Sequence, residues 1–317
     1  MTTRITSLIH TSTTSTLPTP GVTKDKSPTK PWIVLLVLLC LASLVVPASA
    51  QHFQQVTGTL SSVSAGRNEV FGVDDHSVAW RFNPKTNAFA KIKKASLVQI
   101  KVGGGTVSQL DEVWGLNAKT EIYRFDYTSK TFVQITGELT QIAVGVGNQD
   151  DCHPYEVWGV NPDDSIFRYN YCTNGFDQIA GTLSRVATNG GDVWGISSSG
   201  TISHYNFAKQ SFVGVSGTLA QIAVGVNDFW GVNSGNQVFR YDPATGAFNT
   251  IGGNTAQVSA GGDGVWLIDT SSNIWRFDSG SESFVKVGGN LADISVGSGA
   301  GVFGVNASGQ VFTFVRP

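Results

Sequence analysis

The sequence has few charged residues and few of the side chains that usually carry catalysis or bind metals. Lys, Arg, Asp and Glu make up 14% of its 317 residues, and it contains three Cys, five His and one Met. With 41% hydrophobic residues, this composition excludes a solvated, disordered chain for most of the length. The formal net charge of −2 leaves no basic surplus for phosphate groups, so we expect no nucleic-acid partner.

The sequence also lacks a recognisable catalytic motif. Its histidines after residue 50 lie at unrelated positions, and no G-x-S-x-G, H-E-x-x-H or phosphate-cradling loop is present. Paired carboxylates such as Asp163-Asp164 fall in turns, where Asp is common. We therefore expect a protein that is not an enzyme and that has no cofactor and no metal site. An active site assembled from distant acids, as in a hydrolase or lyase, is the less favoured alternative.

The first fifty residues differ from the rest. Residues 2–31 are rich in Thr, Ser and Pro, and residues 32–46 are an apolar run that is short for a membrane span of about 20 residues. Ala48-Ser49-Ala50 follows as a small-x-small cleavage site. These features predict a signal peptide over residues 1–50 and a secreted mature chain over residues 51–317. The alternative is a membrane anchor formed by an uncleaved 32–46 segment.

Glycine is the residue in excess, with 37 copies, and it accompanies many Val, Phe, Trp and Tyr residues. Such a composition favours short strands joined by tight turns. A fragment of the type Val157-Trp158-Gly159 recurs every 36 to 44 residues. Its aromatic position is occupied by Phe71, Trp114, Trp158, Trp194, Trp230, Trp266 and Phe303.

Three further landmarks recur in register with this fragment. Ten residues after the aromatic residue stands Arg81, Arg124, Arg168, His204, Arg240, Arg276 or Thr313. A run opened by Phe and a run ended by Gly, or once by Asn, complete each unit. Four short strands per unit of this length predict an all-β propeller of seven four-stranded blades, with six blades as the alternative. Because the chain starts and stops out of phase, residues 53–56 should pair with residues 311–314 and close the ring.

The pattern VWGVN, then the Arg of IFRY, then FxxIxGxLxxIxVG resembles the tectonin repeat. The resemblance covers Phe53 to Phe314 and implies a tachylectin-like propeller lectin that binds glycans or glycoconjugates, including lipopolysaccharide, at repeated sites. The family also includes proteins used for intracellular interactions, so a non-enzymatic protein-interaction scaffold is the alternative. The chain departs from the six-repeat arrangement by its seven units, so site geometry cannot simply be transferred.

The Trp and Arg series supply the candidate ligand-binding residues. Each Trp could pack between blades, which its regular occurrence favours, or could form a platform for a sugar. Each Arg could pair with acids or carbonyl groups of the next blade, or could bind anionic or hydroxyl-rich sugars. The candidates are Trp114, Trp158, Trp194, Trp230, Trp266, Arg81, Arg124, Arg168, Arg240 and Arg276.

Two adjacent repeats carry insertions, GGTVSQLDE and VGNQDDCHPYE, in the same type of loop and so on the same face of the ring. They are either tolerated length variation or a surface for a protein partner. Cys152 and Cys172 flank one predicted hairpin at its open end, which predicts a disulfide in an exported protein. The neighbouring acids and His153 lack a regular ligand spacing, so we expect no metal there.

Overall fold

The computed structural model describes residues 51–107 and 109–316, and every regular element in those ranges is a β-strand. The predicted signal peptide, its cleavage site and the apolar run 32–46 lie outside the described residues. Over the described ranges, no helix has the length and apolar character needed to cross a membrane.

Consecutive strands pair as antiparallel ladders. Three sheets contain four strands each. The first is β6 (Gln99–Gly103), β7 (Glu112–Leu116), β8 (Glu121–Asp126) and β9 (Thr131–Glu138). The second is β10 (Gln141–Asp150), β11 (His153–Val160), β12 (Ser165–Asn170) and β13 (Gly175–Thr182). The third is β22 (Thr255–Gly261), β23 (Gly264–Asp269), β24 (Asn273–Asp278) and β25 (Ser283–Asn290).

Two further sheets contain eight strands each. One joins β14 (Arg185–Asn189), β15 (Asp192–Ile196), β16 (Thr201–Asn206) and β17 (Ser211–Thr218) to β18 (Gln221–Val224), β19 (Phe229–Val232), β20 (Val238–Asp242) and β21 (Ala247–Gly252). The other joins β2 (Ser62–Ala65), β3 (Val70–Val73), β4 (Val78–Asn83) and β5 (Ala88–Ser96) to β26 (Asp293–Val296), β27 (Val302–Val305), β28 (Gln310–Val315) and β1 (His52–Thr59). In each of them a single parallel residue pair, Ser216 with Ala247 or Thr57 with Ala88, links two antiparallel ladders.

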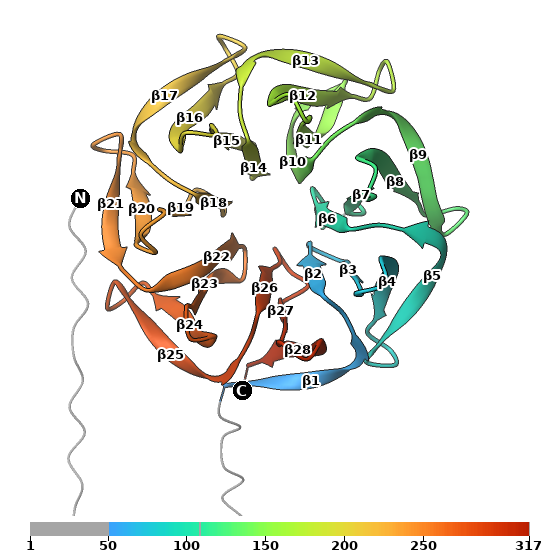
Figure 1. Ribbon diagram of the computed structural model, residues 1–317, viewed down its shortest axis with the longest axis vertical. Coiled ribbons are helices and arrows are strands. Elements are labelled where there is room, and N and C mark those ends of the chain that lie inside the picture. The colour runs from blue at the N-terminus through green and yellow to red at the C-terminus, as the bar shows by residue number, and fades with distance from the viewer. Residues whose placement is uncertain (1–50, 108, 317) are drawn as a thin grey trace, which may run out of the picture. The chain divides into compact units, whose positions relative to one another are not determined.

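The ladders surround a common centre in a propeller arrangement (Figure 1). Their innermost strands are β2, β6, β10, β14, β18, β22 and β26. Each contacts the next in this order, and β26 contacts β2, so the ring is closed.

The two ends of the described chain close the ring in one sheet. β1 pairs with β28 in antiparallel register, with Phe53 opposite Phe314 and Val56 opposite Val311. The predicted pairing of residues 53–56 with residues 311–314 is therefore confirmed. Phe53 also packs edge-on against the buried ring of Trp266, with ring centroids 5.7 Å apart, so β1 joins two ladders.

Side-chain amides connect neighbouring inner strands. Gln141, at the start of β10, accepts a hydrogen bond from the backbone N–H of Val186 at 2.8 Å and donates to the carbonyl oxygen of Val186 at 2.9 Å. Asp293 accepts from the N–H of Val63 at 2.9 Å and links the last inner strand to the first. These bonds satisfy backbone groups that face the next strand of the ring, where no ladder partner is available. We call the position of Gln141 in its repeat, which Gln99, Gln221, Gln257 and Asp293 occupy in other repeats, the clip position.

The glycine that follows the repeated aromatic residue makes room for a leucine. A Cβ atom added to Gly195 would overlap the side chain of Leu183, which is 2% exposed. The β22–β25 ladder reverses the two sizes, with Leu267 at the glycine position and the fully buried Thr255 at the leucine position. One of the two positions is therefore small wherever the other is large.

Candidate functional site

The five candidate tryptophans form the packing between ladders. Trp114, Trp158, Trp194, Trp230 and Trp266 are each 0% exposed. Trp158, for example, meets Tyr205 and Phe212 of the next ladder at centroid distances of 4.7 and 5.9 Å. An indole with no exposed face offers no platform to a sugar, so in this structure the tryptophans pack between ladders rather than line an open binding surface.

Four of the five candidate arginines are held by acids of their own ladder. Arg124 on β8 donates through Nε and Nη2 to the two carboxylate oxygens of Glu112 on β7, at 2.8 and 2.6 Å. Arg168 and Glu156 repeat this fork at 2.8 and 2.5 Å. The acid comes from the adjacent strand of the same sheet and not from the next repeat, which corrects the sequence-based interpretation.

This acid is a recurring feature that the sequence analysis missed. It lies two residues before the repeated aromatic residue and 12 residues before the basic one. The acids are Glu69, Glu112, Glu156, Asp192 and Asp228. Each pairs with the basic residue of its repeat: Glu69 with Arg81, Asp192 with His204 at 3.0 Å, and Asp228 with Arg240 at 2.8 Å. Aligning the repeats on the aromatic residue would have revealed the acid.

The length of the acid decides whether the tryptophan is also satisfied. Glu112 and Glu156 accept hydrogen bonds from the indole N–H of Trp114 and Trp158, at 2.9 and 2.6 Å. Where the shorter Asp stands, the indole nitrogens of Trp194 and Trp230 have no hydrogen-bond partner among the described residues. Glu therefore accepts hydrogen bonds from both the arginine and the tryptophan of its repeat, whereas the shorter Asp binds only the basic residue.

The next repeat supplies an aromatic ring to each of four arginines. The guanidinium carbon of Arg124 lies 5.1 Å from the ring centroid of Tyr171, and that of Arg168 lies 5.4 Å from Phe207. Burial lowers the pKa of Arg124, but the hydrogen bond and charge of Glu112 outweigh it and hold that pKa above its ordinary value. These arginines are permanently charged links between adjacent ladders.

Arg276 departs from the series. Gly264 stands where the other repeats have Glu or Asp, and Arg276 makes no ion pair within residues 51–107 and 109–316. Its guanidinium still lies over the ring of Trp266 at 5.8 Å. The structure therefore leaves one of the five candidate arginines without its acid.

The first insertion is anchored to the preceding repeat through Asp111. This carboxylate, 1% exposed, accepts hydrogen bonds from the backbone N–H groups of Arg67, Asn68, Glu69 and Gly105 at 2.7 to 3.1 Å. Asp111 thus links this insertion to the turn between β2 and β3 of the preceding repeat. At its surface, Val107 and Leu110 remain 86% and 54% exposed.

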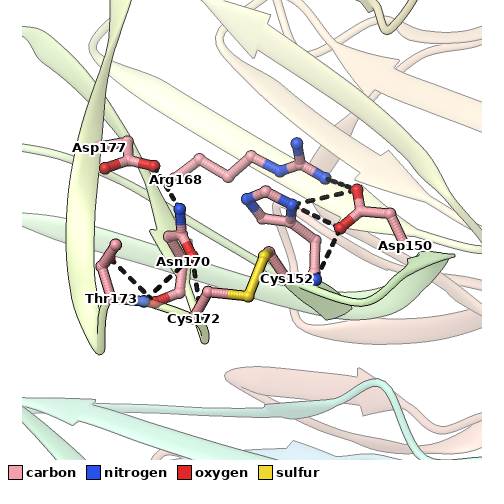
Figure 2. Close-up of a disulfide and its surroundings, with 8 residues drawn as sticks. Asp150, Cys152, Arg168, Asn170, Cys172, Thr173 and Asp177 are labelled. Atoms are coloured by element: carbon pink, nitrogen blue, oxygen red, sulfur yellow. Dashed lines mark hydrogen bonds and ion pairs between the residues drawn. A yellow bond between two sulfur atoms is a disulfide. The ribbon is translucent and has the colours of Figure 1, made fainter.

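The second insertion contains the disulfide (Figure 2). Cys152 and Cys172 are joined with their Cα atoms 5.0 Å apart, so the predicted pairing is confirmed. Beside it, Nδ1 of His153 lies 2.8 Å from Asp150, and Arg168 lies 3.8 Å from the same carboxylate. The two insertions meet where the hydroxyl of Tyr155 donates to the carbonyl oxygen of Leu110 at 3.2 Å, as expected for loops on one face.

Among the described residues, Asp74, Asp75 and His76 form a cluster of three potential metal ligands in a turn. Asp74 accepts hydrogen bonds from the N–H groups of His76 and Val78 and from the indole of Trp80, at 2.8 to 3.0 Å. This carboxylate is engaged in holding its own turn, as expected for Asp in such a position.

A cavity of about 750 Å³ opens on the face opposite the insertions, between β14–β17 and the ladders on either side. Polar side chains line much of it, including Thr140, Gln141, Ser184, Arg185, Ser199 and Ser234. The turn 197–200, which consists of Ser and Gly, forms part of its wall. We call this cavity the serine groove.

Arg185 gives the serine groove its charge. It stands at the clip position of β14, where a guanidinium has no acceptor for the N–H of the next strand. Its side chain is exposed and makes no ion pair in the described part of the chain. The same residue lines a second cavity of about 540 Å³ in the central channel, with Lys101.

Comparison of the sequence with protein-family models shows which family this chain belongs to. The tectonin domain model matches residues 42–214, 112–246 and 218–316, which together span most of the sequence. The chain belongs to the tectonin family. The resemblance inferred from the repeat is thereby confirmed. No curated protein matches the tectonin chain by sequence.

Solved structures share the fold of this tectonin protein at low identity. U3-55K is 10% identical with a TM-score of 0.62, and the match covers 84% of this chain and 98% of that one. Yeast RCC1 (Prp20), solved bound to Kap60, is 9% identical with a TM-score of 0.61, covering 81% and 80%. Human WBSCR16 is 10% identical with a TM-score of 0.61, covering 83% and 88%. At such identities the likeness shows the fold alone.

Proposed function

We propose that this tectonin protein is a secreted, non-enzymatic, seven-bladed propeller that binds carbohydrate in the serine groove. The observation that carries the proposal is Arg185, which replaces a structural clip residue and presents an unpaired guanidinium beside hydroxyl and amide groups. The proposal does not place the site on the buried tryptophans or on Arg81, Arg124, Arg168 and Arg240, because these side chains are already engaged in packing and ion pairs.

The chemistry of the serine groove suits a polyhydroxylated ligand. Ser197, Ser199 and Thr201 form a chain of hydroxyl groups at 2.9 and 3.2 Å, and Thr140 and Ser184 add further hydroxyl groups to the wall. Sugar hydroxyls both donate and accept, so they can bond to hydroxyl, amide and guanidinium groups together. The cavity volume lies within the range of small-molecule sites.

The blade number and the export of the chain belong to the same proposal. Each eight-stranded sheet divides into two four-stranded ladders at its single parallel residue pair. Together with the three four-stranded sheets, this division supports seven blades. The disulfide supports an oxidising location outside the cytoplasm, because such bonds persist there. A protein held in the membrane through residues 32–46 would present the same groove.

A glycan array with the purified, disulfide-bonded protein tests the carbohydrate proposal. Arg185→Gln is the informative variant, because Gln is the ordinary clip residue and should preserve folding. We expect it to weaken glycan binding by about tenfold, the value of one hydrogen bond to a charged group. Arg240→Ala, which breaks an ion pair outside the groove, is the matched control and should leave binding unchanged. No retention of the wild-type protein on any glycan, or equal binding by R185Q, would remove the proposal.

A second candidate function, protein interaction, rests on the insertion face. Exposed Val107 and Leu110 lie on an anchored loop next to the disulfide-bonded insertion. Apolar side chains on an ordered loop are typical of protein contacts. Shortening residues 147–155, with Arg185→Gln as the control, should remove binding to a protein partner in a pull-down and leave glycan binding intact.

A further inference from the structure

Two basic residues stand at inner-strand positions that are not basic in any other repeat. Arg185 occupies the clip position of β14, where five other repeats have Gln or Asp. Lys101 lies on β6 opposite Trp114, two residues after the clip residue. The equivalent residues of the other repeats are small and neutral: Ser64, Ala143, Ala187, Ala223, Ser259 and Ser295.

Both positions serve elsewhere to hold the next inner strand. The clip residues do so through their amide or carboxylate groups, as Gln141 does for Val186. At the second position, the hydroxyl oxygen of Ser64 accepts the N–H of Val102 at 3.0 Å, and two further serines repeat this bond. Ammonium and guanidinium groups donate hydrogen bonds and accept none, so the two basic residues cannot take this role.

The two basic side chains line one cavity and have no acidic partner. Lys101 and Arg185 are exposed, and neither makes an ion pair in the described ranges. Both line the cavity of about 540 Å³ in the central channel, which we call the channel cavity. Asp293 is the one acid among its described lining residues, and its carboxylate already accepts the N–H of Val63 and an amide N–H of Gln257, each at 2.9 Å.

The positions of the two cations allow both to contact one ligand. β10 lies between β6 and β14 in the ring and contacts both strands (Figure 1). At the level of Lys101, β10 presents the small side chain of Ala143, and its longer Gln141 is held against β14 by the bonds to Val186. A ligand in front of β10 can therefore be approached by Lys101 from one side and by Arg185 from the other.

A neutral donor adds to the two cations. Gln99 lies two residues before Lys101 on β6, so both side chains leave the strand on the same face, and both line the channel cavity. The Oε1 atom of Gln99 accepts the N–H of Ile142 at 3.0 Å, which leaves its NH₂ group as a donor. The channel cavity thus combines an ammonium, a guanidinium and an amide.

The positive charge is a local property of the channel. The whole chain has a formal net charge of −2. A smaller cavity of about 230 Å³ continues from Lys101 to Gly104 and Gly105 of the first insertion. It adds Arg67, and its one acid among the described residues is again Asp293. Along the channel, three cations therefore accompany one carboxylate.

We propose that the channel cavity binds a phosphate group between Lys101 and Arg185. The fork of a guanidinium matches two oxygens of a phosphate, and an ammonium supplies a point charge to a third. The phosphate belongs either to the free anion or to a phosphorylated small molecule. The proposal does not depend on glycan binding, because Lys101 lines the channel cavity and does not line the serine groove.

Titration of the ¹⁵N-labelled protein with inorganic phosphate tests the proposal by NMR. At about pH 8 the phosphate is mostly dianionic, and about 150 mM sodium chloride screens diffuse attraction. We expect saturable shifts of the Arg185 Nε–Hε signal and of the amides of β6 and β14, with a dissociation constant below about 1 mM. The Nε–Hε signal of Arg240, which lies in an ion pair on β20, should stay in place.

Three variants locate the site. Lys101→Ser introduces the residue that three other repeats have at this position, and Arg185→Gln introduces the ordinary clip residue, so both should preserve the fold. Each should weaken phosphate binding by about tenfold or more, the value of one hydrogen bond to a charged group. Arg67→Gln is the matched control, because it removes a cation from the channel outside the channel cavity, and it should change the affinity by less than about twofold. Unchanged thermal unfolding of K101S and R185Q without phosphate verifies that a loss of binding is not a loss of fold.

Two further ligands identify the source of the phosphate. Equal affinity for inorganic phosphate and glucose 6-phosphate would support the proposal with the free anion as ligand. Tighter binding of glucose 6-phosphate that is still weakened by K101S would support it with a phosphorylated small molecule as ligand.

Three results would overturn the proposal. The first is the absence of saturable shifts with either phosphate ligand. The second is an equal loss in R67Q, K101S and R185Q, which would indicate diffuse attraction along the channel instead of a site. The third is a shift of the Arg185 signal by D-glucuronate and not by phosphate, which would assign the cavity to a carboxylate. A glycan array on which the protein binds nothing would remove the carbohydrate proposal and leave these phosphate results unaffected.

Discussion

The fully buried carboxylate of Glu156 holds the guanidinium of Arg168 through two hydrogen bonds of 2.5 and 2.8 Å. The same carboxylate accepts the indole N–H of Trp158. Among the described residues, Glu156→Gln leaves the guanidinium of Arg168 with only the half-exposed carboxylate of Asp150, 3.8 Å away, as a counter-charge, so we expect the free energy of unfolding to fall by about 3 kcal/mol. Urea denaturation followed by tryptophan fluorescence measures this loss.

The control for this prediction is Asp228→Asn. Asp228 and Arg240 share one hydrogen bond, and their side chains are 25% and 38% exposed. Solvent screens such a pair, so the loss should be about 1 kcal/mol or less. Equal losses in the two variants would contradict the idea that buried Glu, rather than any acid, secures the ring.

The glycine–leucine complementarity predicts a compensating pair of substitutions. Gly195→Leu alone should overpack Leu183 and lower the free energy of unfolding by about 1–3 kcal/mol. Adding Leu183→Thr reproduces the arrangement of Thr255 and Leu267 and should recover part of the loss. Gly214→Ala, at a glycine whose Cβ would meet nothing within 4 Å, is the neutral control. An additive loss in the double variant would argue against the size exchange.

The repeat made the fold accessible from the sequence, because the alternation of short apolar runs reflects the strands directly. The phase of the repeat at its two ends also sufficed to predict that residues 53–56 pair with residues 311–314. The roles of Trp158 and Arg168 could not be decided in this way. In a propeller both faces of a sheet lie against neighbours, so strand alternation does not distinguish a buried aromatic from an exposed one.

Features outside the repeat period were harder to predict. Asp111 accepts hydrogen bonds from the backbone of Arg67, Asn68 and Glu69. It lies in an insertion, and the repeat pattern of the sequence does not predict where an insertion folds. The serine groove is lined in part by residues 197–200, and a run of Ser and Gly is common in any turn. The absence of an acid for Arg276 can be recognised in the sequence only once the acid of the other repeats is known.

The disulfide should stabilise the second insertion and its ladder. Replacing both Cys152 and Cys172 by Ser removes a link that closes a loop of sequence separation 20, for which the chain-entropy estimate is about 3 kcal/mol. Thermal unfolding of the double variant should shift down, and a reductant should shift the wild-type protein to the same point. Two free thiols in protein recovered from outside the cell would contradict the bond itself.

Stability should depend on pH through Asp269. This carboxylate, 7% exposed, accepts N–H groups of Ser271 and Asn273 and the indole of Trp275. Burial raises its pKa, but the hydrogen bonds outweigh burial and hold the pKa below its ordinary value. Its contribution is therefore complete above the unfolded pKa of about 3.9 and is lost as the pH falls through the folded value.

Asp269→Asn tests this dependence. The variant should be less stable than the wild-type protein at pH 7 by about 1–2 kcal/mol, the value of charge-assisted hydrogen bonds. The difference should shrink below about pH 4 and vanish once the wild-type carboxyl group is protonated. A difference that is independent of pH between 7 and 2 would show that the charge of Asp269 is not responsible.

Removal of β1 should open the ring at its closing sheet. A chain that begins at Thr59 loses Val56, which is fully buried, and Phe53, which packs on Trp266, and it exposes the edge of β28. Each lost apolar side chain removes about 1.5–3 kcal/mol, and the unpaired edge offers a template for association with another copy. Compared with a chain that begins at Gln51, we expect a lower unfolding temperature and aggregation during size-exclusion chromatography with light scattering. If the shorter chain were equally stable and monomeric, the pairing of β1 with β28 would not be what closes the ring.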